Sequence, residues 1–387
     1  MIKFGKRKNL FYPIMSIIFA LSRKVQIILM DKLIGFKSSL LLTIIMFLAE
    51  IISGLIAFIY EKCCIFKKNT GESKFMGITL IQAPDEIKPH DSTFKIYLYI
   101  FIIAVIDFFE FSVDTLYFPK YEDISNSLYI RLRCILTLFS AILSSLILKF
   151  SIYEHQKISL LVIFICLITT IGIDYFFEGE IKNYFFILIL IFINYFFDSI
   201  FDIIEKYLLE YDFVNPFKIV FVEGTFGFIL ACIYTAIESP FKEVKDIYEK
   251  KSNKQFILLI SFLIIYFFLC AGRNIYRVIT NKLYFPITRS LTDSIFDPLL
   301  IIYYYKFETD FYVKDQEGQS FLYFIINLII SVFYVFFGCV YNEVFILFCC
   351  GLDHNTYDQI SKRATILENQ NEFNNNEEFQ EEDNDYE

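Results

Sequence analysis

The sequence has no surplus of basic residues. It carries 35 Lys and Arg against 44 Asp and Glu, and only 20% of its residues are charged. Nine of the acidic residues lie between Glu368 and Glu387, a segment without Lys or Arg, so the rest of the chain holds 35 residues of each sign. A neutral body does not attract a phosphate backbone, which excludes nucleic acid as a partner.

Polar residues rarely interrupt the apolar runs. The chain is 56% hydrophobic with a mean hydropathy of +0.52, whereas soluble domains are about 45–50% apolar. A hydrocarbon layer takes about 20 apolar residues per helical span, so the runs predict an all-α integral membrane protein in a lipid bilayer. Nine spans are predicted near residues 39–60, 95–113, 128–150, 157–177, 183–204, 216–237, 255–277, 287–305 and 320–346.

A tenth candidate span runs from Leu10 to about Met30. It is interrupted by Ser22, Arg23 and Lys24, and is either a first, broken helix or an interfacial segment whose basic side chains snorkel. The predicted organisation is a cytosolic N-terminus (1–9), a first part of five to six helices (10–204), the remaining helices (216–350) and an acidic, disordered cytosolic tail (351–387).

Histidine is scarce. The three histidines, His90, His155 and His354, are all predicted in loops or tails. A metal site or a general base that depends on histidine inside the membrane is therefore not expected. The Gly-x-x-x-x-Gly-Lys-Ser/Thr pattern of ATP-driven proteins is also absent. These absences predict a protein that is not an enzyme and uses no cofactor.

The chain contains a weak internal repeat. Phe47-Leu48-Ala49-Glu50 is followed by Gly54, and Phe221-Val222-Glu223 is followed by Gly227, with glutamate and glycine four residues apart in both. Arg133 and Arg289 also fall near the starts of corresponding spans. The spacing predicts two halves of five helices each, which lie in opposite orientations because five is odd. Transporters often place the substrate site between such inverted repeats.

Ionisable residues inside spans cost roughly 2.5–3.5 kcal/mol each on insertion, so they are the first candidates for function. An arginine can hold an anionic group with two parallel hydrogen bonds, and carboxyl groups can bind a proton or a solute hydroxyl group. The predicted substrate-binding residues are Glu50, Asp107, Arg133, Glu223, Asn274, Arg289 and Asp293.

Structural interpretations remain open for several of these residues. Glu50 and Glu223 could be protonated, hydrogen-bonded structural residues. Arg289 and Asp293 are four apart and could neutralise each other on one helix face. A stripe formed by Asp198, Asp202 and Glu205, with Lys206 beside it, is interpreted first as the wet end of a helix and second as a cation or proton site.

Several short segments resemble the drug/metabolite transporter superfamily, specifically the orphan F-type branch of solute carrier family 35. They occur in the order of that branch: Met46–Glu50, Asp107, Tyr129–Arg133, Glu205-Lys206, Phe217–Phe228, Asn274–Lys282, Thr288-Arg289, Asp293-Ser294 and Tyr341-Asn342. The resemblance covers roughly residues 38 to 350. It implies ten helices in two inverted five-helix repeats, cytosolic termini and transport of small organic solutes, nucleotide sugars in the better understood branches. Cys134 and Arg277 depart from the pattern, since both stand where the branch has glycine.

The expected function is a secondary transporter or exchanger of a small organic solute, which works by alternating access in an endomembrane such as the Golgi, ER or a lysosome-like compartment. The alternative is a transport-inactive scaffold or regulator that keeps the fold and acts through the acidic tail and Cys349-Cys350. The expected partners are the solute and the bilayer, and a homodimer is left open.

Overall fold

The computed structural model describes fifteen segments of the chain. They are residues 2–4, 11–36, 39–60, 72–75, 78–81, 90–112, 126–178, 184–235, 241–250, 253–307, 317–347, 352, 356, 359–360 and 362–363. Most of the predicted N-terminal segment and nearly all of the predicted disordered tail lie outside the described residues.

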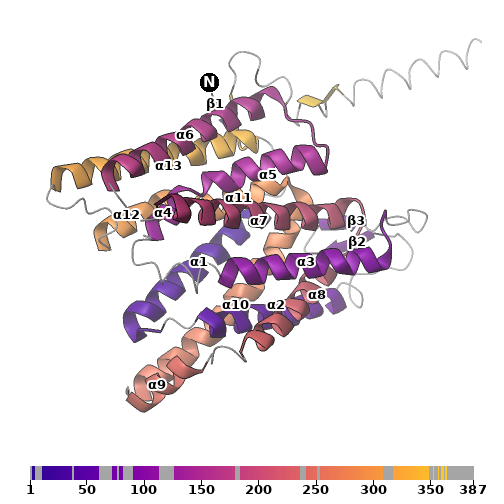
Figure 1. Cartoon of the computed structure of the whole chain (residues 1–387). Coiled ribbons are helices and arrows are strands. Elements are labelled where there is room, and N and C mark those ends of the chain that lie inside the picture. The colour runs from indigo at the N-terminus through magenta and orange to yellow at the C-terminus, as the bar shows by residue number, and fades with distance from the viewer. Residues whose placement is uncertain are drawn as a thin grey trace, which may run out of the picture.

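The described residues are almost entirely helical. The helices are α1 (Phe11–Ile34), α2 (Ser39–Tyr60), α3 (Thr93–Ser112), α4 (Asn126–Arg131), α5 (Cys134–Ile147), α6 (Glu154–Glu178), α7 (Tyr184–Glu210), α8 (Pro216–Tyr234), α9 (Lys242–Lys250), α10 (Asn253–Leu283), α11 (Pro286–Ser294), α12 (Asp297–Phe307) and α13 (Glu317–Tyr341). The long helices form one bundle, in which α6 packs along α13 and α2 along α8 (Figure 1).

Two short antiparallel strand pairs accompany the bundle. β1 (Ile2–Phe4) pairs with β4 (Phe345–Leu347), and β2 (Glu72–Phe75) pairs with β3 (Ile78–Ile81). The first pair joins segments from opposite ends of the sequence, so β1, which precedes the helical region, lies beside β4, which follows it.

Eight helical segments are long and apolar enough to cross a membrane, which supports a multi-pass membrane protein. They lie at Phe11–Ile34, Leu40–Tyr60, Leu128–Ile147, Glu154–Phe177, Phe185–Glu210, Pro216–Tyr234, Asn253–Leu283 and Ser320–Tyr341. The first shows that Ser22, Arg23 and Lys24 do not break α1, which is one continuous helix of 24 residues.

The other two predicted spans do not form long apolar helices. α3 has 20 residues but contains Lys95, Asp107 and Glu110, and the segment predicted at 287–305 is divided between α11 and α12. The division has a local cause. Pro298, the second residue of α12, has no N–H to donate to the carbonyl of Ser294, so α11 cannot continue through this point.

A second interruption lies between α4 and α5. The backbone N–H groups of Arg133, Ile135 and Leu136 each donate to the carbonyl three residues earlier, at 3.0–3.2 Å. This tight turn separates α4 from α5, although Leu128–Ile147 remains one apolar segment long enough to span a membrane. Arg133 therefore lies at a helix break, as do the residues between Ser294 and Asp297.

Glycines allow α2 and α8 to pack closely. A Cβ atom on Gly54 would lie 2.7 Å from the backbone nitrogen of Phe221, and one on Gly224 would lie 2.6 Å from Cβ of Glu50. Small residues of this kind let membrane helices bring their backbones together. The close approach places Glu50 of α2 beside α8, the helix that carries Glu223.

Candidate functional site

Three buried carboxyl groups meet where α2, α3 and α8 pack together. One carboxylate oxygen from each of Glu50, Asp107 and Glu223 lies within 4.8 Å of the corresponding oxygens of the other two. Glu50 and Glu223 are fully buried, and Asp107 is 9% exposed. We call these three residues the carboxylate cluster. The internal repeat identified two of its members, and the third comes from α3.

Helix α10 supplies the polar partners of the carboxylate cluster. Asn274 Nδ2 donates a hydrogen bond of 2.7 Å to Glu50 Oε1. Arg277 Nη2 donates to both carboxylate oxygens of Glu223 at 3.1 and 3.2 Å, and it lies 3.7 Å from an oxygen of Glu205. Asn274 and Arg277 are three residues apart, so they project from neighbouring positions on one helix face. Arg277, which is not one of the predicted site residues, is therefore the counter-ion of one of them.

Glu50 and Asp107 lack a cationic partner within the part of the chain that the structure describes. Neither residue forms an ion pair there, and Glu50 Oε2 and Asp107 Oδ2 are buried without a hydrogen-bond partner. A buried carboxylate without a counter-charge is strongly disfavoured. The carboxylate cluster can therefore avoid this cost by binding a proton or another small cation.

The two helix breaks are joined by Arg133. Its Nη1 donates to Asp297 Oδ1 at 2.6 Å and to the backbone carbonyl of Asp293 at 2.8 Å. Asp297 is the first residue of α12, and Asp293 is near the end of α11. The side chain of Asp293 lies 3.6 Å from Arg273 of α10. This predicted site residue therefore contacts one arginine through its backbone and a second through its carboxylate.

Arg289 pairs with α7 and not with Asp293. It forms ion pairs with Asp198, at 3.4 Å, and with Asp202. The interpretation of the acidic stripe as the wet end of a helix is wrong, because Asp198, Asp202 and Glu205 are all buried.

Lys206, beside the stripe, is also buried. Its Nζ donates to the carbonyl oxygens of Asn281, Lys282 and Tyr284 at the end of α10. The stripe and Lys206 therefore belong to the bundle interior, where α7 contacts α10 and α11.

One aromatic ring contacts two of the arginines. The guanidinium carbons of Arg277 and Arg289 lie 4.7 and 4.5 Å from the ring centroid of Phe201. Phe201 has no obvious sequence signal, because its role depends on which helices face it. Two tyrosines, Tyr129 and Tyr195, are stacked with centroids 4.8 Å apart, and Tyr129 is four residues before Arg133 in the chain.

The structure thus brings the seven predicted residues together in two groups. Glu50, Asp107, Glu223 and Asn274 form the first group, and Arg133, Arg289 and Asp293 belong to a network of ion pairs. Arg277 and Asp297 are outside the predicted set but contact members of it directly. Their spacing is a usable signal, since Arg273 and Arg277, like Asp293 and Asp297, are four residues apart.

One histidine differs from its predicted position. His155 lies in the first turn of α6 and not in a loop; it is buried, and its Nε2 is 3.5 Å from Glu343 Oε1. A helix-borne histidine with a carboxylate neighbour is therefore present in the bundle.

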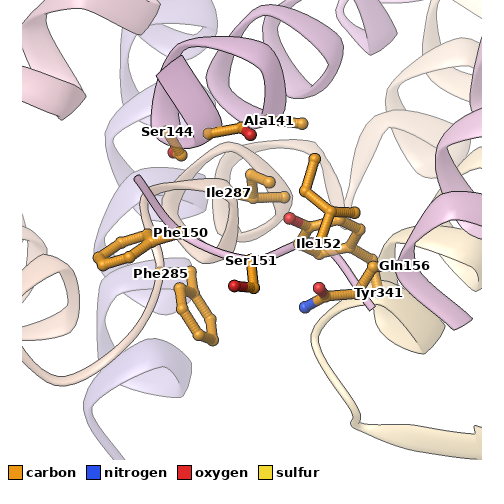
Figure 2. A pocket seen from close by; sticks show the side chains of 10 residues that line it. Ala141, Ser144, Phe150, Ser151, Ile152, Gln156, Phe285, Ile287 and Tyr341 are labelled. Carbon is orange, nitrogen blue, oxygen red and sulfur yellow. The ribbon is translucent and has the colours of Figure 1, made fainter. Parts of the chain in front are cut away.

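Gln156, the residue that follows His155, lines a small pocket. Its lining includes Ser144 of α5, Gln156 of α6 and Tyr341 of α13, together with Phe285 and Ile287 (Figure 2). None of the seven predicted site residues lines this pocket.

No protein-family model matches the chain, and a search of curated proteins finds no match.

Proposed function

We propose that the chain is a secondary transporter or exchanger of a small organic solute, which works by alternating access across an endomembrane. The observation that carries this proposal is the hydrogen bond between Arg133 and Asp297, which joins two interrupted helices inside the bundle. Interrupted helices expose backbone groups and are tolerated at membrane depth where they are buried in protein or line a cavity. In transporters they form substrate sites.

The helix contacts support two five-helix repeats. We match α1, α2, α3, α4/α5 and α6, in order, with α7, α8, α10, α11/α12 and α13. Under this match, each contact between two helices should have a counterpart between the two matched helices. The contact of α1 with α10 corresponds to that of α7 with α3, and the contact of α10 with α2 to that of α3 with α8. The contact of α5 with α7 corresponds to that of α11 with α1, and all six contacts are present. The pairs α2–α8, α6–α13 and α5–α11 each correspond to themselves. The largest helix contacts therefore follow a two-fold relation, and both interruptions fall in matched helices.

The pairing of β1 with β4 supports an even number of spans. Ile2–Phe4 and Phe345–Leu347 lie side by side, so the two ends of the helical region are on the same side. This agrees with the ten-span arrangement and with two termini in the cytosol. Ten spans require α3 to cross the membrane with Asp107 facing the interior, and α11 and α12 to cross together.

The ion pairs suggest how an anionic solute would bind. The guanidinium groups of Arg133, Arg273, Arg277 and Arg289 are each paired with a carboxylate of this chain. A phosphate or carboxylate group of the solute that binds one of these four arginines therefore competes with its carboxylate partner. Exchange at Arg133 would release Asp297 and loosen the contact between the two helix breaks. Binding and helix movement would then be linked at a single hydrogen bond.

The aromatic pair near Arg133 favours a solute that combines an anionic group with a flat ring. Tyr129 and Tyr195 present stacked rings, and Asn194 Nδ2 donates a hydrogen bond of 2.8 Å to Tyr129 Oη. A guanidinium group close to aromatic side chains suits a nucleotide or nucleotide sugar, because a base stacks on aromatic rings and a phosphate pairs with guanidinium.

The test is counterflow uptake into proteoliposomes preloaded with pooled nucleotide sugars, nucleotides or small organic anions. We expect uptake by the unmodified protein and its loss in Arg133→Gln. Lys157→Gln is the matched control, because Lys157 forms an exposed ion pair with Glu154 on α6 and should be dispensable. An unmodified protein that is folded and yet moves none of these solutes would support the scaffold alternative.

A further inference from the structure

We propose that the carboxylate cluster holds one exchangeable proton, shared between Glu50 and Asp107, and that uptake and release of this proton are coupled to solute movement. The coupling rests on the proposed transport function, whereas proton binding does not. The site differs from the Arg133 contact, because it lies between α2, α3 and α8.

Every helix that faces the carboxylate cluster contributes to its charge balance. The ionisable residues that act electrostatically on it are Arg23 of α1, Asp198 and Glu205 of α7, and Cys270, Arg273 and Arg277 of α10. Arg277 is the cation in direct contact and is shared by Glu223 and Glu205. Arg273 pairs with Asp293. Glu50 and Asp107 are therefore left as two like charges without a counter-ion of their own.

Two like charges this close repel each other strongly in a low-dielectric interior. A proton on one of the carboxyl groups removes that repulsion and can bridge the two groups. The oxygens of Glu50 and Asp107 lie within 4.8 Å of each other, so one bridging water or a small side-chain rotation can join them. The distance between the two carboxyl groups thus suits a shared proton.

A second observation comes from a neutral neighbour. Asn274 is fully buried and points into the carboxylate cluster, where its Nδ2 donates to Glu50. Its own Oδ1 has no hydrogen-bond partner among the described residues, and neither do Glu50 Oε2 and Asp107 Oδ2. All three atoms are acceptors without a donor. A proton on a carboxyl group supplies a donor, and so meets a hydrogen-bonding need in addition to the electrostatic one.

A metal ion fits the same place less well. Arg277 already holds both oxygens of Glu223, so a divalent ion would share a ligand with a fixed positive charge. Calcium also takes about six to eight oxygen ligands. Here only three carboxyl groups and one side-chain amide are available to provide them. A proton needs neither the extra ligands nor the extra space.

The cluster also spans the proposed repeats. Glu50 and Asp107 belong to the first five-helix repeat, whereas Glu223, Asn274 and Arg277 belong to the second. The hydrogen bond from Asn274 to Glu50 therefore crosses the boundary that opens during alternating access. When it breaks, Glu50 gains water and can release the proton; when the repeats close again, the carboxyl pair needs a proton once more.

Proton binding is tested without any solute. Infrared difference spectra of the full chain in lipid nanodiscs, recorded between about pH 5 and pH 9, report protonated carboxyl groups through their C=O stretch. We expect a titrating band that is lost in Glu50→Gln and in Asp107→Asn. Glu154→Gln is the control that should keep it, because Glu154 is an exposed carboxylate on α6 that pairs with Lys157.

Two results would overturn the site. One is an infrared C=O band that persists in both Glu50→Gln and Asp107→Asn when these variants are folded. The other is a C=O band that disappears at constant pH when Na⁺, Ca²⁺ or Mg²⁺ is added, since a metal ion would then occupy the carboxylate cluster. Two variants are used because one of them alone could fail to fold, and folding is checked by gel filtration and thermal unfolding.

Coupling is tested in proteoliposomes with an inward proton gradient. The unmodified protein should accumulate solute, whereas Glu50→Gln should keep counterflow exchange and lose accumulation. Loss of both activities in a folded variant, or gradient-driven accumulation that persists, contradicts coupling at this site. If the unmodified protein moves no solute, the transport proposal fails, and the infrared result still decides whether the proton is bound.

Discussion

Arg133, which ends the turn between α4 and α5, donates a hydrogen bond of 2.6 Å to Asp297, the first residue of α12. The two residues are 164 positions apart in the chain. Each lies where a helix is interrupted, so the contact joins two backbone breaks through one charged pair. Buried pairs of this kind contribute little net stability because desolvation offsets their attraction, but removing one partner leaves an uncompensated charge.

Removing either partner of this pair alone should destabilise the protein. Arg133→Gln and Asp297→Asn should each lower the free energy of unfolding by about 3–5 kcal/mol, because the remaining charge stays buried. The double variant should recover most of that loss while transport remains absent. Thermal unfolding in detergent, combined with counterflow, measures both effects. Additive losses in the double variant would show that the two residues are not energetically coupled.

The close packing of α2 and α8 should not tolerate a side chain. Gly224→Ala places a methyl group 2.6 Å from Cβ of Glu50 and 3.0 Å from the backbone nitrogen of Ile51. The helices must then move apart, at a cost of about 1–3 kcal/mol. Gly172→Ala on α6 is the matched control, since nothing lies within 4 Å of the new Cβ atom. An equal melting temperature for the two variants would contradict the close approach.

Lys206 should stabilise the end of α10. Its Nζ donates to three carbonyl groups, at 2.8–3.0 Å, around the turn that leads into α11. Lys206→Met removes these donors and leaves buried acceptors, at a cost of about 1–3 kcal/mol. Hydrogen exchange should increase near Tyr284 at the end of α10. Lys157→Met, on the exposed part of α6, should leave exchange in this region unchanged.

The contribution of Arg289 to folding should be separable from its contribution to transport. Arg289→Ala leaves Asp198 and Asp202 without a counter-ion, so we expect a folding loss of about 3–5 kcal/mol. Adding Asp202→Asn should restore much of the stability. Transport that remains absent in the stabilised double variant assigns Arg289 to solute binding, whereas recovered transport would limit it to an ion-pair role. Counterflow and thermal unfolding are measured on the same preparations.

Much of the architecture follows from local sequence. Apolar runs of about 20 residues predict membrane helices regardless of their neighbours, and eight described helical segments agree with this expectation. The glutamate and glycine spacing in α2 and α8 also correctly selected Glu50 and Glu223 as interior residues. The prediction of one continuous span fails at α11 and α12. Hydropathy contains no information about the backbone hydrogen bond that Pro298 cannot make.

The sequence alone does not show which charged residues pair with each other. Arg289 and Asp293 are neighbours on α11, yet they pair with α7 and α10 respectively. A helix of known period shows which residues share a face, but not which helix covers that face. The same limit explains the acidic stripe of α7 and His155, which are buried because other helices pack over them.

By itself, the sequence determined that this protein is helical, apolar enough for a bilayer, and supplied with charges that a bilayer does not tolerate without partners. Only the tertiary structure decided which charges meet. Among the residues that the structure describes, Glu223 pairs with an arginine, whereas Glu50 and Asp107 do not. The physical reason is that the energy of a buried charge depends on groups a few ångströms away, and those groups lie on helices distant in the chain.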